Sequence, residues 1–283
     1  MVFDELMVKP GKKFNLKKFD TSYTGKYKKN KEKAVEELQK YLAKLPDIQY
    51  KMYADNRYAI LIDLQGIDAA GKDGTLRKVI TALNPHGART WNFKKPSDEE
   101  MDHEYLWRIH PKVPNYGDIG VFNRSYYEDV LITKVKHFIS DDVCEQRYRQ
   151  INDFERYLYE NRFRILKFFL FISKKEQEKR FLDRLLDPTK NWKFSSNDLV
   201  ERNHWDDYLK AFEDMLNATS TKYAPWYVIP ADNKWFRNLA VAALLYETMA
   251  DLDLKWPEPT KETLELVKTA KKTGKLPQVA VKK

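Results

Sequence analysis

Apolar and polar residues follow one another along the chain in blocks that predict an α/β fold. Short apolar runs rich in β-branched and aromatic residues indicate buried strands, and longer stretches with apolar positions three and four residues apart indicate helices. Strands are predicted at 59–64, 88–93, 117–122, 164–172 and 226–229. Helices are predicted at 30–45, 73–83, 97–108, 140–161, 174–187, 197–219 and 234–254. This alternation predicts a central parallel five-stranded sheet flanked by helices.

The first strand leads directly into a glycine loop. Gly66 and Gly71 bracket the loop, Lys72 follows, and the next helix begins at once. Strand, glycine loop and helix in this order are typical of a phosphate-binding loop. The glycines let backbone N–H groups point inward, the helix N-terminus adds partial positive charge, and Lys72 adds a full one. The residues predicted to bind phosphate here are Gly66, Ala69, Ala70, Gly71, Asp73, Gly74 and Thr75.

Two carboxylates make this loop unusual. Asp73 stands where such loops commonly carry the Ser or Thr that holds magnesium, and Asp68 lies inside the loop. A carboxylate beside bound phosphates repels them unless a cation lies between, so Asp68 is a candidate magnesium ligand, or a base for an incoming phosphate. The alternative is that Asp68 forms the turn and Asp73 is an N-terminal helix charge. We favour the alternative for Asp73 and the functional interpretation for Asp68.

Polar residues also follow the second and third strands, where ligands bind in open α/β sheets. Lys94 follows the second strand, a pattern that an ordinary surface lysine also gives. Asn123 and Arg124 end the third strand. Arg124 can clamp phosphate oxygens bidentately, whereas Asn123 can orient water or phosphate but is a weak cation ligand. Glu128 and Asp129 come one turn later, and one of the two can be structural.

A basic segment after the fourth strand is predicted to form a lid over the loop. We call residues 174–196 the lid. Arg180 and Arg184 are one helical turn apart, so both guanidinium groups are expected on one side, facing successive phosphates of an extended polyanion. Lys190 and Lys193 follow the end of this helix at Pro188. A solvated helix face is the alternative.

Composition places the charge at the two ends of the chain. The net charge is +9 over 283 residues, yet residues 1–40 and 261–283 carry nearly all of the excess lysine. Together with the predicted elements, this distribution divides the chain into an N-terminal basic arm and helix at 1–55, a core with the loop and the lid at 56–260, and a basic tail at 261–283. The ends are either solvated or attract a polyanion. We favour solvation on charge alone.

Other features indicate a cytoplasmic enzyme. The single cysteine, Cys144, excludes an intrachain disulfide, and it is predicted to be a core residue. The first residues carry early acids and no apolar core, unlike a signal peptide. No apolar run approaches membrane-spanning length.

Together these residues resemble the polyphosphate kinase 2 family. The resemblance rests on LQGIDAAGKDG at 64–74 and FNRSYYEDV at 122–130, and on further motifs at 84–85, 93–97, 103–108, 180–194, 205–208, 219–226 and 231–235. It implies a P-loop kinase fold similar to that of thymidylate kinase, with an arginine-bearing lid. It also implies magnesium-dependent phosphoryl transfer between inorganic polyphosphate and nucleotides.

The family's site residues can be transferred one by one. The resemblance implies catalytic roles for Asp68, Lys72, Arg124 and Glu128, with Mg²⁺, or Mn²⁺ in its place, resting mainly on Asp68. It implies phosphate or nucleotide binding by Lys94, Arg108, Asn123, Arg180, Arg184, Lys190 and Lys193. Asn123 with Glu128 resembles the class that acts on both AMP and ADP, and guanine nucleotides are further candidates. A homo-oligomer is expected, and neither nucleic acid nor a membrane is expected as a partner.

Two other functions fit parts of the sequence. A conventional ATP-dependent nucleoside monophosphate kinase would share the fold, although Asp68 and the basic lid suit a polyphosphate donor better. A nucleic-acid-binding protein with a vestigial loop would explain the basic ends.

Overall fold

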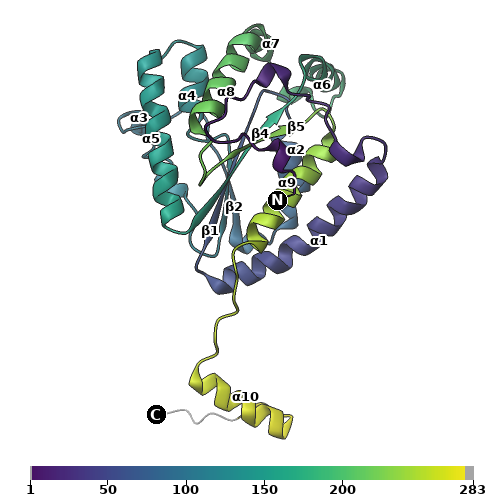
Figure 1. Cartoon of the computed structure of the whole chain (residues 1–283), viewed down its shortest axis with the longest axis vertical. Helices are drawn as coiled ribbons and strands as arrows, with labels where there is room; N and C mark the ends of the chain where they lie inside the picture. Colours follow the sequence, from purple (N-terminus) through teal and green to yellow (C-terminus); the bar gives the residue numbers. More distant parts are fainter. Residues whose placement is uncertain (1, 278–283) are drawn as a thin grey trace.

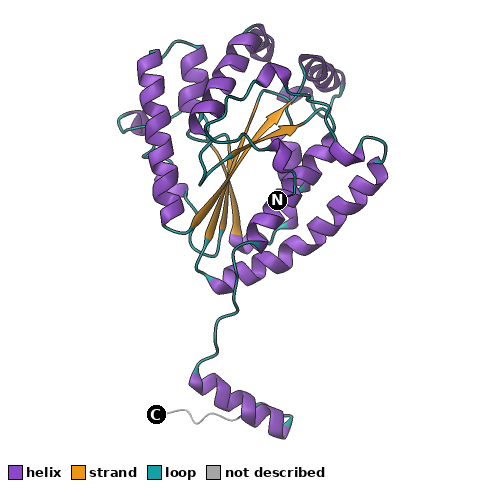
Figure 2. Cartoon of the chain, in the orientation of Figure 1, coloured by secondary structure: helices purple, strands orange, loops and turns teal. Residues whose placement is uncertain are grey.

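The strands form a single parallel sheet in the computed structural model, which describes residues 2–277 (Figures 1 and 2). The strand order is β2-β3-β1-β4-β5, so β1 lies in the middle, paired with β3 on one side and β4 on the other. The strands are β1 (Ala59–Gly66), β2 (Ala88–Asn92), β3 (Ile119–Asn123), β4 (Phe163–Phe171) and β5 (Trp226–Pro230). The parallel five-stranded sheet predicted from the sequence is therefore confirmed.

Helices cover both faces of the sheet. They are α1 (Lys31–Asp55), α2 (Lys72–Lys78), α3 (Asp98–Met101), α4 (Glu128–Val135), α5 (Asp141–Glu160), α6 (Lys174–Leu186), α7 (Ser196–Asn203), α8 (Trp205–Thr219), α9 (Lys234–Ala250) and α10 (Lys261–Thr273). Figure 1 shows α1 and α9 on one face of the sheet, and α4, α5 and α8 on the other.

Alternating residues of β1 build two separate hydrophobic cores. Ile60 and Ile62 point toward α1 and α9, whereas Ala59 and Leu61 point toward α4, α5 and α8. All four are fully buried, which explains why residues 59–62 form a continuous apolar run. Burying each Leu or Ile side chain contributes roughly 1.5–3 kcal/mol, so β1 is held firmly at the centre of the fold. The loop at its carboxyl end is positioned accordingly.

Several predicted helix boundaries are wrong. α1 continues through Pro46 to Asp55, because Gln49 and Met52 extend its buried face beyond the proline. α2 ends at Lys78 and is followed by a short 3₁₀ turn, Ile80–Ala82. The helix predicted from Ser97 to about Arg108 ends at Met101, although Ser97 does form a capping box with Glu100.

The later helices also differ from the prediction. The single helix predicted over 197–219 is two helices, α7 and α8, separated at His204. α9 ends at Ala250, four residues early. The basic tail contains the helix α10, which has no buried residue and lies away from the body of the protein at the end of an extended linker (Figure 1).

The N-terminal segment packs along the last strand. The Val8 N–H donates to the Trp226 carbonyl at 2.8 Å, and the Ser220 hydroxyl donates to the Val8 carbonyl at 2.6 Å. Leu6, Val8 and Leu16 are buried. Residues 2–30, which are lysine-rich and irregular, are therefore packed against the core.

Two further expectations concern single features. Cys144 is fully buried against α4, which confirms it as a core residue. Among the helices of residues 2–277, none is both long and apolar enough to cross a membrane.

Candidate active site

The glycine loop between β1 and α2 has the geometry of a phosphate cradle. Gly71 has φ of 108° and Ala69 has φ of 64°, so the chain turns sharply between them. A Cβ atom at Gly66 would lie 2.6 Å from the Leu170 carbonyl oxygen of β4, so only glycine fits there. Lys72 curls back over the loop and donates from Nζ to the Gly66 carbonyl at 2.6 Å. The loop, its lysine and the start of α2 thus form one positively charged turn.

Charged side chains from β1 and β3 meet at this loop. Arg124 Nη2 lies 3.3 Å from Asp68 Oδ1. Burial lowers the pKa of Lys72, and the charge of Arg124 acts in the same direction. Burial raises the pKa of Glu128, although Arg124 and Lys72 oppose the shift. The predicted catalytic residues Asp68, Lys72, Arg124 and Glu128 are therefore close enough to influence one another.

The end of β3 is fixed to its neighbours by backbone and amide contacts. Arg124 has φ of 62°, and its N–H donates to the Leu64 carbonyl of β1 at 3.1 Å. The Asn123 amide donates to Asn92 Oδ1 at 2.6 Å and reaches Asp73 Oδ1 at 3.5 Å. Asn123 therefore links the ends of β2 and β3 to the start of α2.

The lid arginines do not share one exposed side, and this expectation is wrong. Arg180 is buried behind the loop, where Nη1 donates to the carbonyls of Ala69 and Ala70, each at 2.9 Å. Its Nη2 donates to the Ala231 carbonyl at 2.6 Å. Arg184 lies one turn further on and is half-buried over the Phe181 ring. The first arginine thus holds the loop from behind, and only the second remains partly open to a ligand.

Of the other basic residues predicted to bind phosphate, some contact the loop and others do not. Lys193 reaches the loop, with Nζ 3.3 Å from Asp73 Oδ2. Lys190 is paired with Asp187 within the lid. Arg108 is buried and donates to the Lys94 carbonyl at 2.9 Å, while the Lys94 side chain is exposed.

Loop residues after Lys72 lie partly behind the cradle. Thr75 is fully buried, and its hydroxyl has no hydrogen-bond partner within residues 2–277. Gly74 lies against the Arg237 guanidinium, where an added Cβ would come within 3.0 Å of Nη2.

Two cavities open beside the start of α4. One of about 230 Å³ lies between the loop and helices α7 and α8, and its walls include Asp68, Arg124 and Glu128. Another of about 890 Å³ lies between the segment 96–110 and α5, and its walls include Arg108, Asp129 and Arg147. Burial raises the pKa of Asp129 to about 6, with Arg108 and Arg147 opposing the shift. Glu128 lines the first cavity, and Asp129, the next residue in the chain, lines the second.

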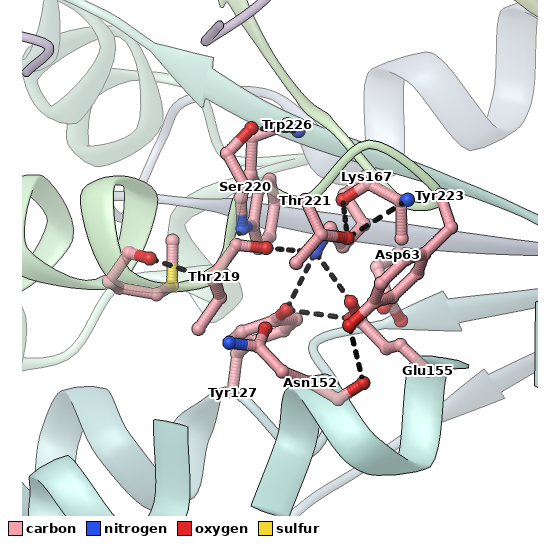
Figure 3. Close-up of polar contacts among 12 residues, drawn as sticks. Asp63, Tyr127, Asn152, Glu155, Lys167, Thr219, Ser220, Thr221, Tyr223 and Trp226 are labelled. Atoms are coloured by element: carbon pink, nitrogen blue, oxygen red, sulfur yellow. Dashed lines mark hydrogen bonds and ion pairs between the residues drawn. The ribbon is translucent and has the colours of Figure 1, made fainter. Parts of the chain in front are cut away.

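A buried polar network anchors the start of α4 (Figure 3). Lys167 of β4 donates to Glu155 Oε2 and to the Thr219 carbonyl, both at 2.7 Å, and to the Tyr127 hydroxyl at 3.0 Å. The Tyr127 hydroxyl also donates to Glu155 Oε1 at 2.6 Å. Tyr126 extends the network to Asp63 Oδ2 at 2.8 Å. These contacts fix the turn that presents Glu128.

Sequence reasoning missed several residues that support the site. Arg237, Lys167 and Asp63 are charged residues within apolar segments, and that contrast was the available signal. Gln177 donates to the Asp68 carbonyl at 3.0 Å and is buried at the start of the lid. Nothing in its position in the sequence indicated this contact.

The carboxylates near the loop decide how a metal ion could be held. Among residues 2–277, no group of three or more His, Cys, Asp or Glu side chains could hold a metal ion. Mg²⁺ commonly takes only one or two carboxylates and completes its shell with substrate phosphates and water. Asp68 fits that role, since its side chain is 37% exposed beside Arg124. The residues therefore suit a cation held jointly with phosphates.

Comparison with known proteins identifies the family. The family model for polyphosphate kinase 2 matches residues 25–256. An AMP/ADP-polyphosphate phosphotransferase of Meiothermus ruber is 44% identical over 92% of this chain and 97% of its own length. An ADP-polyphosphate phosphotransferase of Rhodopseudomonas palustris is 43% identical over 93% of this chain and 96% of its own. The crystal structure of polyphosphate kinase 2 from Arthrobacter aurescens superposes with a TM-score of 0.88, at 41% identity, over 94% of this chain and 96% of that one. The fold is thus that of a P-loop kinase, and the chain belongs to the polyphosphate kinase 2 family.

Proposed function

We propose that this protein transfers phosphoryl groups reversibly between inorganic polyphosphate and AMP or ADP, and acts on guanine nucleotides as well. The observation that carries the proposal is the convergence of Lys72, Arg124, Asp68 and Glu128 at a phosphate loop. Relatives that match nearly the full length of the chain are named for this chemistry. The proposal includes a cytoplasmic location, and assembly into a homo-oligomer stays a prediction.

The topology supports separate binding sites for the two substrates. β1 carries the loop in the middle of the sheet, and the lid follows β4 on one side of it. The ends of β3 and β2 lie on the other side, with the larger cavity beyond them. Polyphosphate is therefore assigned to the loop and lid, and the acceptor nucleotide to the β3 side.

The larger cavity suits the nucleoside part of the acceptor. Its volume of about 890 Å³ falls in the range of small-molecule sites. Tyr105 offers a ring face, already stacked against Arg147 at 4.8 Å. Asp129 Oδ2 accepts no hydrogen bond within the described chain, so it is available to an N–H or O–H group of a nucleoside. This acidic acceptor suits adenine and guanine alike.

The reaction proposed is a direct transfer. An oxygen of the acceptor's terminal phosphate forms a bond to the last phosphorus of polyphosphate. The bond from that phosphorus to its bridging oxygen breaks, and a chain one phosphate shorter leaves. Both reactants are anions, so Lys72, the loop N–H groups and Arg124 are needed to offset their repulsion and to stabilise the charge that develops. No covalent enzyme intermediate is required.

The other residues position these groups and exclude water. Asp68 orients Arg124 through their ion pair. The lid contacts the loop through Lys193 and Asp73, which shields the reacting phosphates so that transfer outcompetes hydrolysis. Mg²⁺, or Mn²⁺ in its place, would be held by Asp68, with Glu128 nearby, and would supply charge neutralisation and orientation of the phosphate oxygens.

One assay tests the function and the alternatives. The full-length protein is offered polyphosphate or ATP as donor, with AMP, ADP, GMP or GDP as acceptor, with and without magnesium. We expect transfer from polyphosphate to both AMP and ADP, dependent on the divalent cation. Transfer from ATP alone would support a conventional nucleotide kinase. Inert AMP beside active ADP would contradict the assignment to the class that acts on both.

The nucleic-acid alternative needs a different measurement. Because residues 2–30 pack on β5, only the tail at 261–283 can be removed without disturbing the core. Tight binding of duplex or single-stranded DNA that is lost with the tail, together with no phosphoryl transfer, would favour that alternative.

A further inference from the structure

An arginine in the middle of an apolar helix lies directly behind the phosphate loop. Arg237 belongs to α9, whose neighbouring residues Phe236 and Leu239–Leu245 are fully buried. The Arg237 residue is only 3% exposed. Its Nε and Nη2 donate to the neutral amide oxygen of Asn238 at 3.1 and 2.9 Å, and its Nη1 donates to the Ala70 carbonyl at 3.3 Å. Within residues 2–277 it makes no ion pair.

A second guanidinium shares this position. Arg180 donates to the same Ala70 carbonyl, and its one carboxylate partner in the described part of the chain is Glu176, at 2.8 Å. Burial lowers the pKa of Arg237 to about 10, and the charge of Arg180 acts in the same direction. The group therefore stays charged at neutral pH. Two positive charges are thus buried here, and a single carboxylate, Glu176, balances them. This excess charge lowers the stability of the folded protein when no ligand is bound.

The Arg237 guanidinium lies against the backbone of the loop at residues 70–71. A Cβ atom at Gly71 would lie 1.8 Å from Arg237 Nη1, so the guanidinium occupies the space that a side chain there would need. The Ala70 carbonyl belongs to the same planar peptide as the Gly71 N–H, and in a trans peptide the two point in opposite directions. Holding the carbonyl from behind therefore turns the Gly71 N–H toward the side on which phosphate binds.

We propose that Arg237 is a positioning residue for the polyphosphate donor, which fixes the 70–71 peptide of the loop and supplies an uncompensated positive charge behind it. This inference rests on the proposed function and specifies how the loop favours a long polyanion. The unpaired charge is unfavourable in the free protein and becomes favourable when an anion occupies the loop. Arg237 therefore lowers the stability of the free protein and raises its affinity for polyphosphate.

The proposal predicts that replacing Arg237 changes stability and polyphosphate affinity in opposite directions. Arg237→Met keeps the length of the side chain and removes its charge. We expect the free variant to melt at the same temperature as the wild type or above it, since replacing an unpaired buried charge by an apolar group is favourable. Its affinity for tripolyphosphate, measured by calorimetry without nucleotide, should fall roughly tenfold or more, because the positive charge behind the loop is lost and the 70–71 peptide is no longer held. The KM for AMP should change less than the KM for polyphosphate.

Two further variants complete the test. Arg237→Lys keeps the charge but cannot hold Asn238 and Ala70 together, so its affinity for tripolyphosphate should lie between those of the wild type and Arg237→Met. It also carries the test if the methionine variant does not fold. Arg164→Met is the control, because Arg164 lies at the opposite end of β4 and stacks on Tyr58 and Tyr159. Its tripolyphosphate affinity should equal that of the wild type.

A purely structural role gives the reverse result. If Arg237→Met melts well below the wild type while binding tripolyphosphate normally, the proposal is overturned. Equal affinity of the lysine and methionine variants would also overturn it, since charge would then have no part. A wild-type protein that transfers no phosphate from polyphosphate would instead refute the proposed function.

Discussion

Lys193 of the lid lies 3.3 Å from Asp73 at the start of α2, so a carboxylate of the loop region holds a lysine that a phosphate could also bind. Burial raises the pKa of Asp73, but the hydrogen bond and the charge of Lys193 outweigh it, and the net pKa is lowered. Asp73 therefore stays ionised at neutral pH and competes with phosphate for Lys193.

The first prediction follows from this competition. Asp73→Asn should release Lys193 and lower the KM for polyphosphate by a few fold, with little change in the KM for AMP. The pair is largely exposed, so the free energy of unfolding should change by less than about 1 kcal/mol. Steady-state kinetics at low and high salt provide the measurement. A raised KM for polyphosphate would show that Asp73 assists binding instead.

The second prediction concerns Lys72. Lys72→Ala removes a charge whose one hydrogen bond within the described residues is to the Gly66 carbonyl, so the protein should fold normally. Turnover should fall by roughly 10²–10³, as expected for loss of a group that stabilises transition-state charge. Single-turnover transfer from polyphosphate to ADP measures the effect. Lys78→Ala, an exposed lysine on the same helix, is the matched control. A Lys72→Ala variant that keeps most of its turnover would refute the role of the loop.

The third prediction concerns Asp68. Asp68→Asn keeps the shape of the side chain but loses the ion pair with Arg124 and the carboxylate proposed to hold the cation. Activity should fall, and nucleotide binding should lose its dependence on magnesium. A magnesium titration of nucleotide affinity, in wild type and variant, checks this. If the variant is normal at ordinary magnesium concentrations, the metal role belongs to Glu128 or Asp73.

The fourth prediction separates the two lid arginines. Arg180→Ala removes hydrogen bonds to three buried backbone carbonyls, so we expect a loss of about 2–4 kcal/mol in the free energy of unfolding. Arg184→Ala should change stability by less than about 0.5 kcal/mol. It should raise the KM for polyphosphate, more strongly at high salt, because screening weakens the contacts that remain. Urea unfolding and kinetics of both variants decide whether the division of roles holds.

The fifth prediction is a pH dependence of stability. Burial, together with the nearby Glu155 charge, raises the pKa of Asp63 to about 7. Between pH 4 and 7 the folded protein therefore keeps a proton that the unfolded chain releases, and stability falls as pH rises through that window. The groups that face Asp63 are Tyr126, Ser125, Glu155 and Lys167.

Replacement of this carboxyl tests the assignment. Asp63→Asn cannot titrate, so its loss of stability between pH 5 and pH 8 should be smaller than that of the wild type by on the order of 2 kcal/mol. Urea unfolding at the two pH values gives the comparison. Parallel pH profiles for variant and wild type would refute the assignment of the titrating proton to Asp63.

The sequence allowed the strands and the centre of the site to be predicted. Strand positions agree within two residues, because buried parallel strands are apolar runs bounded by polar residues. The meeting of Lys72 with Arg124 and Glu128 could be expected, since the carboxyl ends of parallel strands share one edge of the sheet.

The rest depends on what lies opposite each side chain. Helical spacing puts Arg180 and Arg184 one turn apart. It does not reveal that carbonyl groups of the loop lie against Arg180, whereas Arg184 lies over the Phe181 ring. Lys167 is acceptable in an apolar strand because Glu155 and Thr219, from other elements, supply its partners, and Arg237 likewise reaches the Ala70 carbonyl from a segment far away in the sequence. Pro46 looked like the end of a helix because local propensity was considered without the buried side chains that follow it.

The central position of β1 has a consequence for engineering. In the proposed arrangement, determinants of the acceptor belong to the stretch 88–150, and determinants of the donor belong to the lid and α9, at 174–245. The earlier stretch supplies β2 and β3 on one side of β1, the later one supplies β5 on the other side, and the two also meet directly where α4 and α5 pack against α8. Exchange of the earlier stretch between relatives should transfer nucleotide preference, and exchange of the later one should transfer preference for polyphosphate length.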